Sequence, residues 1–220
     1  FKKGYNVKAL EEYFLQDKLD KGTGSVAYRP ALSITYFMDM ALYYPDLGYY
    51  ANPETTIGRK GDFYTSPHLH PAFGAMIAKT LMEMWAGMGR PATFHAVEMG
   101  AGIGYLCRDI FDYLVNISPV NAVVKDKDTF LKSLRYVIVE PYAHFEMKQR
   151  EVTGKFAKDI IWVNELNDDI TGCIFSNELP DAFPVHLVEM EDELKEIYVA
   201  HDGEKFTEIK KAASTPAIPE

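Results

Sequence analysis

The stretch that decides how this chain is interpreted covers residues 97–104. It runs Val97-Glu98-Met99-Gly100-Ala101-Gly102-Ile103-Gly104. An apolar segment precedes the acidic residue, and apolar residues recur at helical spacing from Leu106 to Leu114, so the stretch predicts a strand, a tight turn and a helix. Glycines in such a turn let a nucleotide-like ligand touch the backbone, because a Cβ atom would hold the ligand away.

The spacing of these glycines differs from the dinucleotide-binding pattern G-x-G-x-x-G. The third glycine of that pattern allows the helix to pack closely on the strand. Tyr105 stands at that position here, and the glycine falls one residue earlier, at Gly104. This difference in spacing disfavours an NAD-dependent oxidoreductase. The alternative to a ligand-binding turn is a strand–helix turn that binds no ligand.

Four short apolar segments alternate with helical or polar stretches. These predicted strands cover residues 94–98, 135–140, 160–164 and 172–177. Such an order predicts right-handed crossovers and one parallel sheet, with the 94–98 strand in the middle. Residues 116–133 indicate a solvated connection, and alternating residues after 185 predict further strands and a hairpin.

Polar residues stand at the carboxyl ends of the four predicted strands. They are Glu98, Glu140, Asn164, Glu165, Asn177 and Glu178. The carboxyl ends of parallel strands share one edge of the sheet, where α/β proteins bind their ligands. The sequence therefore predicts a ligand site at that edge.

Composition excludes several function classes. The 220 residues suffice for one domain with a sizeable core, and a net charge of −9 without a long basic run argues against a nucleic-acid partner. The sequence contains no run of about 18 apolar residues, which is the pattern that would predict a membrane span. Cys107 and Cys173 form no CxxC pair and indicate buried thiols of a reducing compartment. His68 and His70 alternate without a third ligand at useful spacing, so no metal is expected.

Two series of motifs together resemble the MidA-like family of methyltransferases that depend on S-adenosyl-L-methionine (SAM). The first contains Gly61-Asp62-Phe63 and Thr65-Ser66-Pro67. The second contains the glycine turn, Val139-Glu140 and Ser176-Asn177-Glu178-Leu179-Pro180-Asp181-Ala182-Phe183-Pro184-Val185. The resemblance spans roughly residues 35–210, and Pro180 departs from it where a bulky apolar or aromatic residue is expected.

The resemblance implies an α/β fold, namely a Rossmann-like class I SAM methyltransferase sheet with helices on both faces. The expected organisation is an N-terminal helical segment over 1–60, a SAM-binding domain over 61–190, and a β-hairpin and tail over 191–220 that begin a substrate region. Family members are considerably longer, so we expect the sheet to be incomplete at its C-terminal side, and we expect cofactor binding to survive better than turnover in the chain alone. Either the 185–209 hairpin or a second copy of the chain, as a homodimer, is expected to cover the edge at 172–177.

The resemblance also implies SAM as the cofactor and a place for each part of it. The backbone of Gly100, Ala101, Gly102 and Gly104 would meet its carboxylate, and Glu98 its ammonium group. Glu140 suits the two ribose hydroxyls, since a carboxylate accepts two hydrogen bonds at once. Asn164 and Glu165 would face the adenine, while Thr65 and Ser66 would close over the amino-acid end. The alternatives without a ligand are a strand-end carboxylate for Glu98 and for Glu140, a solvated turn for Asn164 and Glu165, and a helix cap for Thr65 and Ser66.

Asn177, Glu178 and Asp181 are the residues expected beside the transferred methyl group. Eukaryotic members of the family methylate a protein arginine as mitochondrial complex I assembly factors. Carboxylates that grip a guanidinium could localise its charge and leave the remaining nitrogen more nucleophilic. Asp181 has a capping role as its alternative, and His186 lies in a strand-like run that favours a packed histidine.

The leading hypothesis is therefore a protein arginine methyltransferase, with a respiratory-chain subunit as its protein substrate. The alternatives are a non-catalytic assembly factor that keeps the fold, and a small-molecule methyltransferase. The expected location is the cytoplasm for a bacterial protein and the mitochondrial matrix for a eukaryotic one.

Overall fold

The computed structural model describes residues 10, 31–55, 66–116, 126–166, 169–201 and 205–218. The chain divides into two compact units. One is Thr56–Leu179, and the other joins Phe1–Thr55 to Pro180–Glu220. This division differs from the three consecutive segments expected from the sequence, because the amino-terminal segment and the carboxyl-terminal strands belong to one unit.

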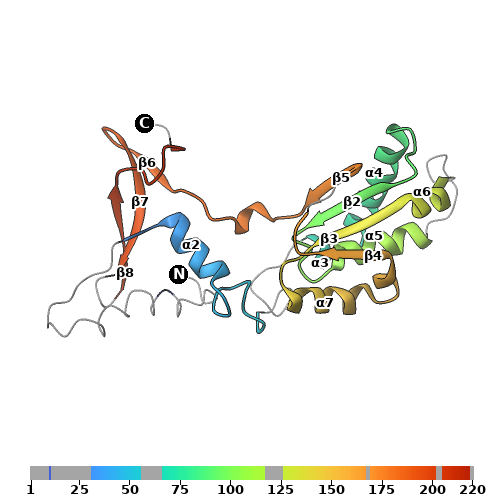
Figure 1. Cartoon of the computed structure of the whole chain (residues 1–220), viewed down its shortest axis with the longest axis horizontal. Coiled ribbons are helices and arrows are strands. Elements are labelled where there is room, and N and C mark those ends of the chain that lie inside the picture. Colours follow the sequence, from blue (N-terminus) through green and yellow to red (C-terminus); the bar gives the residue numbers. More distant parts are fainter. Residues whose placement is uncertain are drawn as a thin grey trace. The chain divides into compact units, whose positions relative to one another are not determined.

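The unit of residues 56–179 is built on a four-stranded parallel sheet (Figure 1). Its strands are β2 (Phe94–Met99), β3 (Leu134–Val139), β4 (Ile160–Val163) and β5 (Gly172–Ser176). Their order is β4-β3-β2-β5, and each neighbouring pair is parallel. The predicted parallel sheet with the 94–98 strand inside it is confirmed, and the strand bounds shift by a single residue.

Helices connect these strands and supply most of the core. They are α3 (Ser66–Leu69), α4 (Ala72–Gly87), α5 (Tyr105–Asn116), α6 (Lys127–Ser133) and α7 (Ala143–Thr153), followed by the 3-10 helix η3 (Gly154–Asp159). Buried residues of α4, α5 and α6 pack against alternate strand residues such as Phe94, Tyr136 and Ile138. The helical spacing of apolar residues after the glycine turn predicted α5 correctly, since Leu106, Ile110 and Leu114 are all buried.

The helix α6 corrects the expectation that residues 116–133 form a solvated connection. Residues 127–133 are helical, and Phe130 is fully buried, with its ring 5.5 Å from Trp85 and 5.8 Å from Phe94 between centroids. The expectation was wrong because a seven-residue helix with five polar residues shows too few apolar positions to reveal its period. Residues 117–125 lie outside the described residues.

The opposite face of this sheet carries a row of apolar residues. Ile161, Val137, Val97 and Ile174 lie side by side across β4, β3, β2 and β5. Val97 and Val137 are buried, whereas Ile161 and Ile174 at the two edges are about half exposed. The strands of the 185–209 segment pair within a separate sheet, so none of them hydrogen-bonds along β5. Cover by a second copy stays a prediction, and sedimentation equilibrium is the measurement that tests it.

The second unit contains a small antiparallel sheet and one helix. Its elements are β1 (Leu32–Ser33), α2 (Ile34–Tyr43), η4 (Pro180–Ala182), β6 (Val188–Met190), β7 (Leu194–His201) and β8 (Phe206–Lys211). The central strand β7 pairs with β1, β6 and β8. Leu10 and Leu32 are buried against residues of α2 and β7. Of the expected N-terminal helical segment over 1–60, only Leu10 and residues 31–55 are described, and residues 202–204 of the expected hairpin also lie outside the description.

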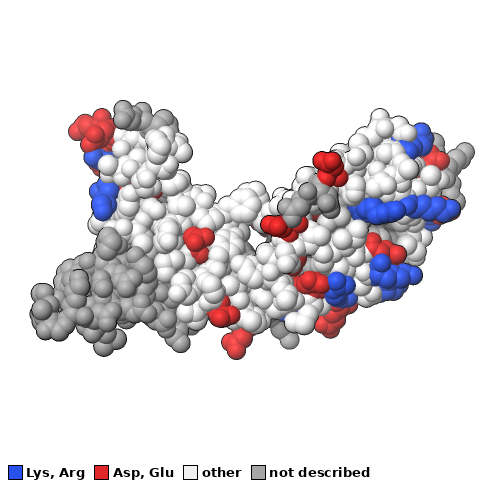
Figure 2. Space-filling view, in the orientation of Figure 1, with Lys and Arg blue, Asp and Glu red and all other residues white. Residues whose placement is uncertain are grey.

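The described part of the surface carries charges of both signs. On the face drawn in Figure 2, Lys and Arg side chains occur together with Asp and Glu side chains, and the net charge is −9. Among the described residues, no helix has the length and apolar character that crossing a membrane requires.

Candidate cofactor site

The glycine turn connects the end of β2 to the start of α5. Gly100, Gly102 and Gly104 have φ angles of +71°, +56° and +91°, a conformation that glycine adopts without the penalty paid by other residues. An added Cβ atom would lie 2.8 Å from Leu179 Cδ1 at Gly100 and 3.2 Å from Gln149 Cα at Gly104, but within 4 Å of nothing at Gly102. Gly100 and Gly104 therefore allow Leu179 and Gln149 to pack close to the turn, whereas the space beside the backbone of Gly102 is open.

The helix α5 begins directly after this turn. Gly104 N–H donates to Ala101 O at 2.9 Å, and Arg108 N–H donates to Gly104 O at 3.0 Å. The first N–H groups of a helix are not bonded within it and carry a partial positive charge, so this end of α5 favours an anionic group.

Glu140 follows β3 and is held by two donors. Its Oε1 accepts from Tyr142 N–H at 3.0 Å and its Oε2 accepts from Gln149 Nε2 at 2.7 Å. Burial raises the pKa of Glu140 to about 7, although both hydrogen bonds oppose the rise. Each carboxylate oxygen can accept a further hydrogen bond, as two adjacent ligand hydroxyls require.

Glu98 points into the core of the unit beneath the glycine turn. It is 2% exposed, and its Oε2 accepts from the Tyr136 hydroxyl at 2.7 Å. Burial raises the pKa of Glu98 to about 7, against the hydrogen bond from Tyr136. The same burial, together with the charge of Glu98, raises the pKa of the Cys107 thiol. Contact between Glu98 and an ammonium group stays a proposal.

The buried carboxyl of Glu98 predicts that stability falls as the pH rises. The pKa of Glu98 is about 7 in the folded chain and 4.5 as its ordinary value, so the folded chain binds the proton more tightly. The free energy of unfolding should therefore drop by about 3 kcal/mol between pH 4.5 and pH 8 on account of this group. Glu98→Gln should remove that part of the drop in urea unfolding, whereas Glu151→Gln on the exposed side of α7 should retain it. An equal slope in the wild type and Glu98→Gln would contradict the assignment.

Four more predicted residues of this unit lie at the same edge of the sheet. Asn164 and Glu165 follow β4 and are exposed. Asn177 and Glu178 follow β5, and Glu178 is exposed with a φ of +55°. A non-glycine residue in this left-handed conformation is strained, and such strain often occurs at functional sites. The next residue, Leu179, has its side chain close to Gly100, in space that a Cβ atom at Gly100 would occupy.

Three further residues were predicted for this site. Asp181 is exposed and lies in η4 of the other unit. Thr65 lies outside the described residues, and Ser66 is the first residue of α3 with its side chain also outside the description. Within the described ranges, no group of three or more His, Cys, Asp or Glu residues could hold a metal ion.

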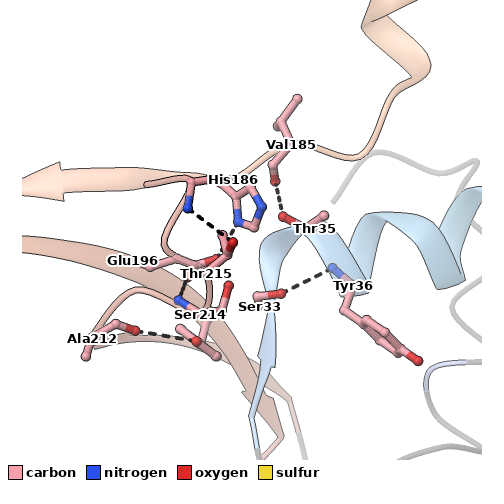
Figure 3. A network of polar contacts seen from close by, with 11 residues as sticks. Ser33, Thr35, Tyr36, Val185, His186, Glu196, Ala212, Ser214 and Thr215 are labelled. Atoms are coloured by element: carbon pink, nitrogen blue, oxygen red, sulfur yellow. Dashed lines mark hydrogen bonds and ion pairs between the residues drawn. The ribbon is translucent and has the colours of Figure 1, made fainter. Parts of the chain in front are cut away.

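His186 belongs to a polar network in the second unit (Figure 3). Its Nδ1 lies 2.8 Å from Oε1 of Glu196, a fully buried residue whose Oε2 accepts from Ser214 N–H at 2.6 Å. Burial would raise the pKa of Glu196, but the hydrogen bonds from His186 and Ser214 outweigh it and hold this pKa below its ordinary value. His186 contacts a buried carboxylate but is itself exposed and lies before β6, which differs from the packed histidine within a strand that was expected.

Sequence reasoning missed the buried partners of the site. Gln149 bonds both Glu140 and Gly102, Trp162 Nε1 donates to Gln149 Oε1 at 2.9 Å, and Tyr136 bonds Glu98. A glutamine within a polar helix carries no sequence signal of burial. The one available hint was its place on the helix that directly follows Glu140.

The comparisons with known proteins agree with this geometry. A family model of S-adenosyl-L-methionine-dependent methyltransferases matches residues 76–220, more than half of the chain. The chain belongs to this family. The cofactor of the family is SAM, and the expected MidA-like resemblance and Rossmann-like fold are confirmed.

Relatives and solved structures place the chain within a longer protein type. It is 29% identical over 203 residues to the mitochondrial protein arginine methyltransferase NDUFAF7 homolog of Drosophila melanogaster, covering 80% of this chain and 44% of that protein. The human mitochondrial protein arginine methyltransferase NDUFAF7 is 26% identical over 205 residues, which cover 84% of this chain and 46% of the relative. A Burkholderia thailandensis structure bound to S-adenosyl-homocysteine has a TM-score of 0.74 at 23% identity, covering 96% of this chain and 50% of that one. The chain thus spans about half the length of these relatives.

The residues at the sheet edge fit SAM. The open space at Gly102 admits a ligand against the backbone, the start of α5 favours its carboxylate, and Glu140 can accept two hydroxyl groups. These three observations concern this chain's own geometry and do not depend on the relatives.

Gly102→Ala should weaken binding of S-adenosyl-homocysteine by about tenfold or more, because the new methyl group enters the open space and a 1.4 kcal/mol loss is one decade in affinity. Gly154 is a matched control, since its φ is +52° and an added Cβ atom there also meets nothing within 4 Å. Both variants should lose about 1–2 kcal/mol of stability from backbone strain. Calorimetric titration that finds equal affinity losses in Gly102→Ala and Gly154→Ala would contradict a ligand at Gly102.

Proposed function

We propose that this chain is the cofactor-binding part of a protein arginine N-methyltransferase that acts in respiratory complex I assembly. The observation that carries the proposal is the open backbone at Gly102 beside the carboxylate of Glu140, at the carboxyl ends of adjacent parallel strands. The names of the relatives support arginine as the target and a mitochondrial location for eukaryotic forms. A bacterial form would act in the cytoplasm.

Each binding residue has one task in this proposal. When bound, SAM supplies a methyl group on a positively charged sulfur. Gly100, Ala101, Gly102 and Gly104 would hold its carboxylate through the backbone, and Glu140 its ribose. Asn164 and Glu165 would receive the adenine, and Thr65 and Ser66 would cover the amino-acid end. Glu98 would act on the ammonium group from beneath the turn.

The substrate side of the site is carried by Asn177, Glu178 and Asp181. An arginine guanidinium stays protonated, so it is a poor nucleophile until its charge is localised. Paired hydrogen bonds donated by two guanidinium nitrogens to the carboxylate of Glu178 would localise that charge on these nitrogens and orient the third toward the methyl group. The strained backbone of Glu178 and its place after β5 support this role. Asp181 would assist or cap the following segment.

The test is transfer of a tritiated methyl group from SAM to arginine-containing peptides. Peptides in which lysine replaces arginine serve as the matched control. The proposal expects label on the arginine peptides with a longer form of the protein, and weaker transfer with residues 1–220. SAM binding without transfer by either form would instead support a non-catalytic assembly factor, and transfer only to small molecules would support the small-molecule alternative.

A further inference from the structure

Gln149 lies at the centre of a hydrogen-bond network that joins three separate elements. It is on α7 and fully buried. Its Nε2 donates to Glu140 Oε2 at 2.7 Å and to Gly102 O at 2.9 Å, and its Oε1 accepts from Trp162 Nε1 at 2.9 Å. One amide group thus holds the residue after β3, the glycine turn and β4 together.

A carboxamide is the only neutral side-chain group that can make these three bonds. It carries two N–H donors and an acceptor oxygen on one planar group. Leucine or methionine at this position would leave the buried acceptor Glu140 Oε2 and the partly buried acceptor Gly102 O without this donor. A buried acceptor that loses its partner costs more than the bond itself contributes.

Packing on both sides fixes the amide in place. An added Cβ atom at Gly104 would lie 3.2 Å from Gln149 Cα, so the glycine allows α7 to approach the turn. One turn further along α7, Thr153 Oγ1 donates to Gln149 O at 2.8 Å. On the other side, the Arg150 guanidinium lies 3.9 Å from the ring centroid of Trp162.

We propose that Gln149 is a positioning residue for nucleoside binding, which ties the carboxylate of Glu140 to the carbonyl of Gly102 and so holds that carboxylate in the orientation that receives the ribose. Gln149 acts through Glu140 and needs no contact with the ligand. The proposal rests on the proposed function, since it takes Glu140 as the acceptor of the two ribose hydroxyls.

Loss of the amide has two consequences for Glu140. The carboxylate becomes free to turn away, and one of the two hydrogen bonds that oppose the rise of its pKa disappears. More of Glu140 is then protonated at neutral pH, where a carboxylic acid accepts hydroxyl groups less well. The affinity loss should therefore be larger at pH 7 than at pH 9, a difference that simple damage to α7 would not produce.

Binding of S-adenosyl-homocysteine to residues 1–220 tests the proposal by calorimetry. Gln149→Leu should lower the affinity about tenfold at pH 7, the loss expected for one charge-assisted hydrogen bond. Gln149→Met keeps the length of the side chain and serves as a second variant with the same expectation. Ser133→Ala removes a buried hydrogen bond on α6, from Ser133 Oγ to Phe130 O, and should keep the wild-type affinity.

A double-mutant cycle distinguishes positioning from structural damage. With Glu140→Ala already present, Gln149→Leu should cost no further affinity, because the carboxylate through which Gln149 acts on the ribose is gone. The 2′,3′-dideoxy analogue of S-adenosyl-homocysteine should bind the wild type and Gln149→Leu equally. Additive losses, or an equal loss for the dideoxy analogue, would overturn the role of Gln149. No binding by the wild type would instead contradict the proposed function itself.

Discussion

Glu140→Ala is expected to weaken S-adenosyl-homocysteine binding by one to two orders of magnitude while the fold is kept. A carboxylate that hydrogen-bonds ligand hydroxyls contributes about 1.5–3 kcal/mol, and 1.4 kcal/mol corresponds to a factor of ten. Glu140 is buried after β3 and holds two protein donors, so its carboxylate has a fixed position before the ligand arrives. Isothermal titration calorimetry at pH 8, where the group with a pKa of about 7 is ionised, gives the affinity.

The control for this variant is Glu151→Ala, an exposed carboxyl on α7. It should bind S-adenosyl-homocysteine as the wild type does. An unchanged affinity in a folded Glu140→Ala variant would mean that the ribose is held elsewhere.

Glu178→Gln should lower methyl transfer to arginine peptides by about 10² to 10³, because removing one charge-stabilising group from a reaction site costs that much. Binding of S-adenosyl-homocysteine should stay within about twofold of the wild type, since cofactor binding is assigned mostly to residues 98–140 and not to Glu178. The exposed position of Glu178 after β5 leaves its carboxylate accessible to a guanidinium.

Comparison of initial rates for the wild type and Glu178→Gln measures this effect at saturating SAM. Asp192→Asn changes an exposed carboxyl between β6 and β7 and should keep the wild-type rate. A Glu178→Gln variant that transfers methyl groups at the wild-type rate would move the catalytic role to another residue.

The parallel sheet could be predicted because its signals are local. Each strand is a short apolar run that ends in a polar residue, and the intervening helices show their period, as α5 does with Leu106, Ile110 and Leu114. The cap of α2 is local as well, since Ser33 accepts a hydrogen bond from Tyr36 N–H, three residues on.

The parts that escaped prediction depend on contacts between distant residues. The two-residue strand β1 forms because it pairs with Val199 and Tyr198 of β7. The sequence around Leu32 contains no pattern that predicts this pairing. The helix α6 is held chiefly by Phe130, one aromatic residue in a polar stretch. The division into two units follows from the same long-range pairing.

The candidate site shows the same limit on a smaller scale. The carboxylates at strand ends were visible because strand and turn patterns place them there. The different surroundings of these carboxylates could not be predicted from the sequence. Glu98 is bonded to Tyr136 inside the core, whereas Glu140 is bonded to Gln149 beside the turn. Tertiary packing decides which donor hydrogen-bonds to each carboxylate, and the local sequence pattern does not predict this choice.

The measurement that tests the central claim most directly is calorimetric titration of residues 1–220 with SAM, S-adenosyl-homocysteine and NAD. We predict that SAM and S-adenosyl-homocysteine each bind at one site, that both bind more weakly to Gly102→Ala, and that NAD gives no binding heat. Absence of SAM and S-adenosyl-homocysteine binding by the folded chain, or tighter binding of NAD, would contradict the assignment of this sheet edge to a SAM site.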